Sequence, residues 1–466
     1  MCDYWLDLDS EQGIIKKYLN KDNNRHKKYD ALLPFITKTG QNTSYYTNFT
    51  GAVGAFSRYM SGIKTKYVID YDSFHNEIRK RLDECNEEEL KTLFEIIDSL
   101  YFEQGSVLPV NVRSLNFIES NTSQEQVAEF LYGIFVKPFD LDKLYKAMQD
   151  EEDTNILDKL VFDSLGYDNR KDAPSDVKAD CYLPYVQSVF KQDFEALCSN
   201  PDTYKKYIFR FLAYYYVFYV TQLAVKFSKF EHCDRTEIED IYMTLNWEVI
   251  SRSRLGYKYG WRYVSDKLSH MYSHAVLLEL ISYNAENKHF DYLELFERFC
   301  NAPNDSSTAN EIARLIEIYK DWIGPGVDFS KCTHDASKDG CCLTLNKVRF
   351  LYETIDYQFL NGSRKSHYKG FNDKFIEFAQ RNFRRRRGQY GYTIGVNEND
   401  IIMFTQIILS ENGGKVLITS LFEEFEKRGL KFDRDSKKKI TELFEKMNFL
   451  DKKSDCGEAQ YVKSVL

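Results

Sequence analysis

The chain has 466 residues, a formal net charge of −8 and 29% charged residues. Its length exceeds that of one ordinary domain and predicts about two to four folding units. The negative charge excludes a generally basic coat for nucleic acid, so any such contact has to come from a local basic patch. Because the chain holds 8 Pro and 22 Gly against 34 Tyr and 34 Phe, we expect a mainly α protein with long helices.

The N-terminal residues are acidic and lack the basic and apolar regions of a signal peptide. The 10 cysteines form no disulfide framework, which predicts a reduced, cytoplasmic protein. An apolar run at residues 211–225, between Arg210 and Lys226, is shorter than the about 20 residues that a membrane span needs. We therefore expect a buried helix there and no membrane contact.

Apolar residues recur at helical spacing in several stretches of the chain. This periodicity predicts helices at residues 87–100, 124–136, 204–229, 266–283 and 310–323. A strand is predicted at residues 65–70, and linkers at 168–174, 301–307 and 324–340. The predicted organisation is an N-terminal α or α+β region (1–120), a helical core domain (121–326), a linker segment with a basic helix (327–395) and a terminal domain (396–466).

A run of four arginines precedes the terminal domain. Phenylalanines at helical spacing predict a helix over residues 371–387, and Gly388 is a natural stop for it. Arg384, Arg385, Arg386 and Arg387 would then occupy its last turn, where cations complement the negative end of a helix.

The terminal domain has the element order of a winged helix. We expect a helix at residues 398–409, a short strand at 415–418, two further helices and a terminal hairpin closed by Phe449-Leu450 and Tyr461-Val462. Thr419 or Ser420 is placed to cap the second helix, and Glu423 lies at capping-box distance from Ser420. Asp433 or Asp435 is placed to cap the third. The predicted fold is thus a multi-helical body with a C-terminal winged-helix (α+β) module.

Cations on the third helix and the wing are candidate DNA contacts. Lys438, Lys439 and Lys446 lie off the apolar face of the helix, and Lys452 and Lys453 lie on the wing. Together with the arginine run they predict contacts with the backbone of duplex DNA. Because Glu442 and Glu445 share the helix, the alternatives are a solvated face or a module that docks a protein.

A second basic stretch at residues 251–263 interleaves cations with aromatic residues and contains no acid. Its cations are suited to phosphates and its aromatic faces to exposed bases. The alternative is a loop that packs Tyr and Trp onto the helical core with solvated cation tips. The candidate DNA contacts in this stretch are Arg252, Arg254, Lys258 and Arg262.

No cofactor is firmly predicted, and zinc is the candidate metal of one Cys/His segment. Cys332, His334, Cys341 and Cys342 are soft ligands that could hold zinc, but their irregular spacing favours a reduced-thiol loop. His270 and His274 share a helix face, yet residue 271 is Met, so the glutamate of a zincin motif is missing. The sequence also lacks a phosphate-binding loop, which predicts that the chain does not hydrolyse nucleotides.

Three phrases resemble the DptG/DndG family, the G subunit of the phosphorothioation-dependent DNA restriction system. They are residues 421–429, residues 453–463 and residues 242–280, the last with Leu245-Asn246-Trp247-Glu248, Gly260-Trp261 and Ser273-His274-Ala275. The resemblance implies a bacterial defence complex that attacks DNA lacking the host's phosphorothioate modification. It also implies two partner subunits, F and H, that carry the nucleotide-hydrolysis machinery.

The residues and the resemblance together predict a non-catalytic DNA-binding and assembly subunit of such a complex. One alternative is a pure protein-docking scaffold of the same complex. Another is a metal-dependent nuclease, although no paired-carboxylate site can be assembled from the sequence.

Overall fold

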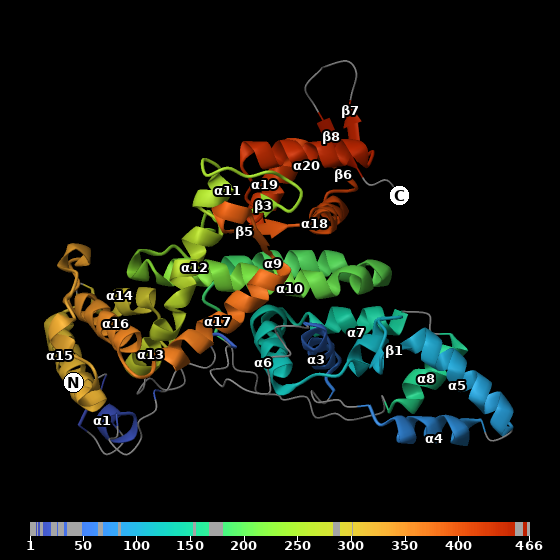
Figure 1. The fold of residues 1–466 in the computed structure, drawn as a ribbon, viewed down its shortest axis with the longest axis horizontal. Coiled ribbons are helices and arrows are strands. Elements are labelled where there is room, and N and C mark those ends of the chain that lie inside the picture. The colour runs from blue at the N-terminus through green and yellow to red at the C-terminus, as the bar shows by residue number, and fades with distance from the viewer. Residues whose placement is uncertain are drawn as a thin grey trace. The chain divides into compact units, whose positions relative to one another are not determined.

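The structure, a computed structural model, is mainly helical, as the composition predicts. It describes residues 6, 8–9, 13–19, 26, 32–34, 49–63, 69–82, 85–151, 155–166, 180–282, 289–300, 302–452 and 460–463. The chain divides into two compact units. Unit 1 comprises residues 1–39, 220–239 and 263–377, and unit 2 comprises residues 40–219, 240–262 and 378–466. The chain passes between the units within α10, α12 and α17, which Figure 1 labels, and also between Glu239 and Asp240.

Unit 1 is built from helices. They are α1 (Ile14–Lys17), α13 (Met271–Ile281), α14 (Tyr292–Phe299), α15 (Asp305–Ile323), α16 (Leu343–Asn361), and parts of α10 (Pro201–Phe227), α12 (Trp261–Ser269) and α17 (Lys365–Asn382). The helix predicted at residues 310–323 is confirmed by α15, which ends at Gly324 with a left-handed φ of 75°. α16 packs against both α13 and α15, and the buried faces of these helices form the core.

The helix predicted at residues 266–283 is wrong in one respect, because it is interrupted. α12 ends at Ser269 and α13 begins at Met271. His270 lies at the break and places Nδ1 2.9 Å from Oδ1 of Asp356. Ser273 Oγ and the Tyr368 hydroxyl each donate to the same carboxylate oxygen at 2.7 Å. This polar cluster joins α13, α16 and α17 at the break.

The cluster predicts a pH dependence of stability. The hydrogen bond to Asp356 raises the pKa of His270 above its ordinary 6.5, against the opposing effect of burial. Burial acts to raise the pKa of Asp356, but the hydrogen bond and charge of His270 lower it overall. The pKa shifts of both residues therefore favour the charged ion pair. A raised histidine pKa contributes stability that is fully present below pH 6.5 and is lost as the pH rises through the folded-state pKa.

We therefore expect the free energy of unfolding to fall above pH 6.5, and His270→Gln to show a smaller decrease. Urea unfolding of both proteins from pH 5.5 to 8.5 measures it. Asp356→Asn is the companion variant and should flatten the same part of the curve. Identical pH profiles for wild type and His270→Gln would contradict the assignment. The neighbouring His274 does not share this site, since its Nδ1 contacts the Tyr292 hydroxyl at 2.6 Å and burial lowers its pKa to about 3.

Unit 2 contains most of the helices and all the strands that the described residues form. Its helices are α3 (Thr50–Ser61), α4 (Tyr71–Arg81), α5 (Glu87–Tyr101), α6 (Thr122–Leu131), α7 (Asp142–Glu151), α8 (Ile156–Ser164), α9 (Pro184–Cys198), α11 (Leu255–Lys258), α18 (Glu398–Glu411), α19 (Ile418–Lys427) and α20 (Arg434–Lys446). The helices predicted at residues 87–100 and 124–136 are confirmed by α5 and by α6, which continues as a π-helix over Tyr132–Val136.

The apolar run at residues 211–225 lies in α10, which confirms the predicted buried helix. Tyr214, Tyr215, Tyr216 and Tyr219 are all buried, and their rings contact other aromatic side chains of unit 2. Among the helices of the described ranges, α10 alone is long and apolar enough to cross a membrane. Of its most apolar window, 89% is buried inside the protein, as in the core helix of a globular fold.

A buried charge cluster joins α19 to two other helices of unit 2. The Arg428 side chain, only 1% exposed, donates to Asp193 of α9 through Nε at 2.8 Å. Its other nitrogens donate to Glu411 at 2.8 Å and to Glu424 at 2.7 Å. Tyr215 also donates to Asp193, whose side chain is 0% exposed. Because the guanidinium satisfies three carboxylates, this cluster fixes the end of α19.

Three small sheets complete unit 2. The strands are β1 (Phe102–Glu103), β2 (Ser106–Val107), β3 (Thr244–Leu245), β4 (Arg384–Arg386), β5 (Tyr392–Val396), β6 (Lys415–Leu417), β7 (Leu450–Lys452) and β8 (Gln460–Lys463). β1 pairs with β2, the second sheet has the order β3-β5-β4, and the third has the order β6-β8-β7. The predicted strand at 65–70 falls mainly on residues 64–68, outside the described part of the chain, as does the predicted linker at 168–174.

Two local predictions near the C-terminus are wrong. The helix predicted to 387 ends at Asn382, and the arginines form β4, because this segment pairs antiparallel with β5. The second helix of the terminal domain begins at Ile418, so Thr419 and Ser420 lie inside it, and its N-cap Leu417 makes no side-chain bond. The cap of the third helix is correct, since Asp433 accepts a hydrogen bond from the Ser436 amide at 3.0 Å.

Candidate nucleic-acid interface

The two basic stretches of the sequence meet in the second sheet. β3 pairs parallel with β5, with Thr244 opposite Gly395, and β4 pairs antiparallel with the other side of β5. A side-chain bond between Thr244 and Thr393, at 2.9 Å, joins residues 149 positions apart. Figure 1 shows β3 and α11 beside β5 and the C-terminal elements. β5 lies between β3 and β4, and the segment that follows β3 approaches the arginine run at Trp261, whose ring centroid lies 5.4 Å from the Arg384 guanidinium carbon.

Arg387 holds these segments together. Its guanidinium donates to the carbonyl oxygens of Leu245 at 2.7 Å and Glu248 at 2.8 Å, and to the hydroxyls of Thr244 and Thr393 at 3.1 Å each. Burial lowers its pKa from the ordinary value. These bonds satisfy the carbonyls that follow β3, so Arg387 serves the fold and does not face a ligand.

Arg384 is also packed against the protein. Its guanidinium carbon lies 3.5 Å from the ring centroid of Tyr392 and 5.4 Å from that of Trp261. Burial lowers the pKa of Arg384. The stack of two rings on one cation stabilises the junction between β5 and the start of α12.

Arg385 and Arg386 are the exposed members of the run. Each is exposed and has no carboxylate partner among the described residues. Since side chains alternate along a strand, Arg386 shares the face of Arg384 and Tyr392, whereas Arg385 shares the face of Arg387. β4 is an edge strand, so both cations can meet an anion from solvent.

Arg254 has the same structural role as Arg387. It donates to both oxygens of Asp433 at 2.6 Å, to Glu248 at 2.8 Å and to Ser436 at 2.9 Å, and its side chain is 12% exposed. The hydrogen bond to Asp433 raises the pKa of Arg254 further, so it stays charged. This network seats the N-terminus of α20 against residues 248–254.

The remaining cations of the segment are exposed. Arg252 lies with its guanidinium carbon 5.7 Å from the Tyr390 ring centroid, and Lys258 and Arg262 have no ion-pair partner within the described ranges. On α20, Lys438 and Lys446 are exposed and have no ion-pair partner among the described residues. Lys439 forms an ion pair with Glu442 at 2.7 Å. The side chain of Lys452 is not described, and Lys453 lies outside the described residues.

Arg434 is a site residue that sequence analysis missed. It is exposed, has no partner in the described part of the chain, and directly follows Asp433, which Arg254 holds. A cation in the first turn of a helix is unfavourable beside the positive end of the helix dipole. That unfavourable position is the signal that could have marked it.

The predicted zinc ligands are not brought together. His334 places Nδ1 2.7 Å from Glu353 and Nε2 2.7 Å from Asp339. Cys342 contacts Asp305 at 3.6 Å and lies beside Cys300, whereas Cys332 hydrogen-bonds to Thr354 and Cys341 is exposed. Within the described ranges, no group of three or more His, Cys, Asp or Glu is placed to hold a metal ion.

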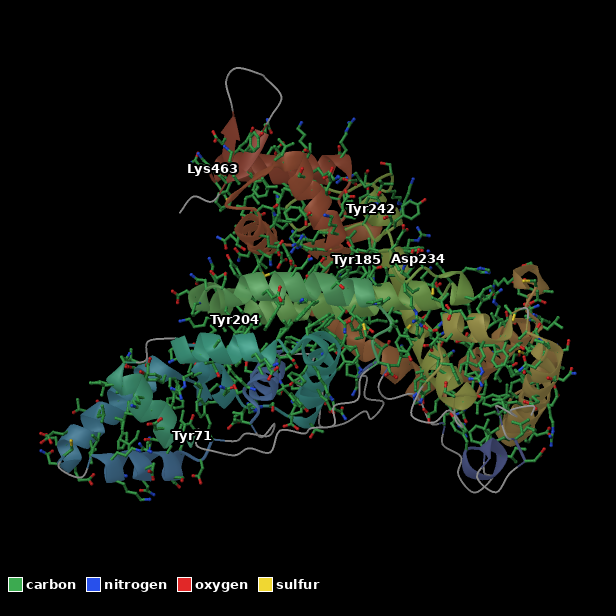
Figure 2. All side chains as sticks on the ribbon, turned by 180° about the vertical axis from the view of Figure 1, so that it is seen from behind. Tyr71, Tyr185, Tyr204, Asp234, Tyr242 and Lys463 are labelled. Carbon is green, nitrogen blue, oxygen red and sulfur yellow. The ribbon has the colours of Figure 1, made fainter. Side chains whose placement is uncertain are left out.

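We use the name basic face for the exposed cations of residues 252–262, β4 and α20 that have no ion-pair partner among the described residues. Tyr242, labelled in Figure 2, lies among the side chains of the C-terminal elements beside it. The members of the basic face are Arg252, Lys258, Arg262, Arg385, Arg386, Arg434, Lys438 and Lys446.

No family model matches the sequence, and no curated protein matches it either.

Proposed function

We propose that this protein is a DNA-binding and assembly subunit of a phosphorothioation-dependent restriction complex, with no catalytic site of its own. The observation that carries the proposal is the basic face. Eight exposed cations without ion-pair partners in the described part of the chain gather in one unit of a protein whose net charge is −8. Phosphates neutralise such cations and release condensed counterions, which drives binding without a requirement for sequence.

The terminal elements support a winged-helix assignment for the DNA-binding module. Their order is α18, β6, α19, α20, β7 and β8, and the sheet order β6-β8-β7 is antiparallel throughout. In a winged helix the third helix is the recognition element. α20 holds that place here and carries Arg434, Lys438 and Lys446 on its exposed side.

The wider role rests on the resemblance to the DptG/DndG family. On this basis we propose that the chain is a cytoplasmic partner of the F and H subunits and that nucleotide hydrolysis belongs to those subunits. The helical surface of unit 1 is then available for assembly. In this proposal the chain brings DNA to the complex, and the phosphodiester chemistry belongs to another subunit.

The test is DNA binding by a variant with Arg385→Ala and Arg386→Ala. Arg384 and Arg387 stay in place because they support the sheet. Loss of two phosphate contacts is expected to weaken binding to duplex DNA by about 10- to 100-fold at low salt. The slope of log K against log[salt] should decrease by about 1 per residue. Fluorescence anisotropy over a salt series measures both quantities.

The matched control is Lys91→Ala with Lys159→Ala. These residues are exposed, unpaired lysines on α5 and α8 of the same unit, so the control changes the net charge equally. It should leave affinity and salt slope at wild-type values. Equal losses in both double variants would mean that only net charge matters, and no loss in either would remove the basic face from DNA binding.

A protein-docking scaffold is the second candidate. The observation in its favour is that Arg254 and Arg387 hold the fold, and that Lys437 and Lys439 pair with Glu426 and Glu442 at 2.6 and 2.7 Å. α20 thus carries fewer free cations than its sequence suggests. Wild-type protein that binds no DNA but forms a tight complex with the F and H subunits would establish this role.

A further inference from the structure

Two tyrosines on the basic face are exposed in a protein that buries its aromatic residues. The chain has 34 Tyr and 34 Phe. Among the described residues, the exposed large aromatic side chains are Tyr259, Tyr392 and Phe296. Tyr259 is 48% exposed and Tyr392 is 41% exposed. Tyr259 directly follows the exposed Lys258, and Tyr392 lies opposite the exposed Arg386 in the sheet, so each ring is next to a cation of the basic face.

Tyr392 is held in place on one side of its ring. The Arg384 guanidinium covers it at 3.5 Å, and the Trp261 ring lies on the same cation. Arg386 is the cross-strand partner of Tyr392 and shares its face of the sheet. The ring is therefore pre-ordered beside an unpaired cation, which lowers the entropy lost when a planar ligand stacks on it.

Tyr259 is fixed by the backbone around it. Its amide donates to Leu255 at 2.8 Å and its carbonyl accepts from Tyr242 at 2.9 Å. Its ring lies 6.4 Å from that of Tyr242. A Cβ added at Gly260 would lie 2.3 Å from the Gly256 oxygen and 2.7 Å from that of Tyr242, so this close turn requires glycine. Lys258 and Arg262 flank the turn.

We propose that Tyr259 and Tyr392 stack on unpaired bases of single-stranded DNA while the neighbouring cations bind its phosphates. This inference rests on the proposed DNA-binding function and adds the substrate class. Bases in a duplex are stacked on one another and offer no free face, whereas each unpaired base has one. Rigid exposed rings between cations are the combination that binds single strands without sequence preference.

The experiment compares three ligands of one sequence and about 16 nucleotides: single-stranded DNA, duplex DNA and single-stranded RNA. The proteins are wild type, Tyr259→Ala/Tyr392→Ala and Tyr259→Phe/Tyr392→Phe. We expect the alanine variant to lose affinity for single-stranded DNA by about tenfold or more per ring, with duplex affinity changed far less. The phenylalanine variant should retain wild-type affinity, because it keeps the rings.

Thermal unfolding of each variant distinguishes loss of binding from loss of the folded state. Quenching of the fluorescence of a 2-aminopurine base in the single strand reports stacking directly. Quenching by wild type and the phenylalanine variant, and not by the alanine variant, is the expected pattern. Unchanged single-strand affinity in the alanine variant, or tighter binding of RNA than of DNA, would overturn the inference. Wild-type binding of duplex alone would also overturn it and leave the proposed function standing. Wild-type binding of neither form of DNA would remove both.

Discussion

Arg428→Ala is expected to lower the free energy of unfolding by about 3–5 kcal/mol. The substitution removes the cation that compensates Asp193, a carboxylate with 0% exposure, and leaves that charge with the Tyr215 hydroxyl as its remaining described donor. It also separates Glu411 and Glu424 from the guanidinium that lies between them. Removing one partner of a buried ion pair costs this much because the remaining charge is buried without a compensating charge.

Equilibrium unfolding in urea, followed by far-UV circular dichroism, measures the effect. Lys427→Ala is the matched control, because Lys427 is the preceding residue and forms an exposed ion pair with Glu424 at 2.6 Å. An exposed pair contributes about 0–1 kcal/mol. If Arg428→Ala unfolded at the same urea concentration as Lys427→Ala, the buried cluster would not stabilise unit 2 in the way described.

Arg254→Ala is the second large expected effect, again a loss of about 3–5 kcal/mol in the free energy of unfolding. Arg254 lies between Glu248 and Asp433, whose side chains are both buried, and its removal leaves two neighbouring carboxylates without a cation. The N-terminus of α20 would lose its attachment to residues 248–254. Thermal and urea unfolding measure the loss.

The variant Arg252→Ala tests whether the structural role of Arg254 is distinct from the proposed DNA binding. Arg252 is two residues away and exposed, and its one described contact is the Tyr390 ring. A surface substitution of this kind changes stability by about 0.5 kcal/mol or less. It should instead weaken duplex binding and reduce the salt slope by about 1. If Arg252→Ala destabilised the protein as much as Arg254→Ala, the division into structural and exposed cations would be wrong.

The helices of the fold could be predicted because their signals are local. Apolar spacing located α5, α10 and α15, and an acid at capping distance located the start of α20. Only the local pattern of each segment was needed, since α5 and α15 each bury one face and the apolar run of α10 is buried on all sides. The terminal elements could be placed in order for the same reason, although the cap of α19 could not, because tertiary packing starts that helix at Ile418.

The second sheet could not be predicted, because its information is not local. Four consecutive arginines have no strand pattern, and β4 exists because β5 accepts it as an edge. The parallel pairing of β3 with β5 connects residues about 150 positions apart, which no periodicity reveals. The sequence alone also does not distinguish structural arginines from exposed ones. In the structure, Arg254 and Arg387 bind carboxylates and carbonyl oxygens. Arg385 and Arg386 are exposed to solvent.

The pairing of β3 with β5 also sets an order in time during synthesis. Residues 251–262 leave the ribosome long before β5 exists, and Arg254 has no acid to bind in α20 until Asp433 has been made. At about 5–20 residues per second, about 6–25 seconds of translation separate Arg262 from Arg385. A nascent chain therefore carries these cations on a segment without its final partners. If the proposed DNA binding needs both segments, we expect it only late in translation, after the C-terminal elements have been made.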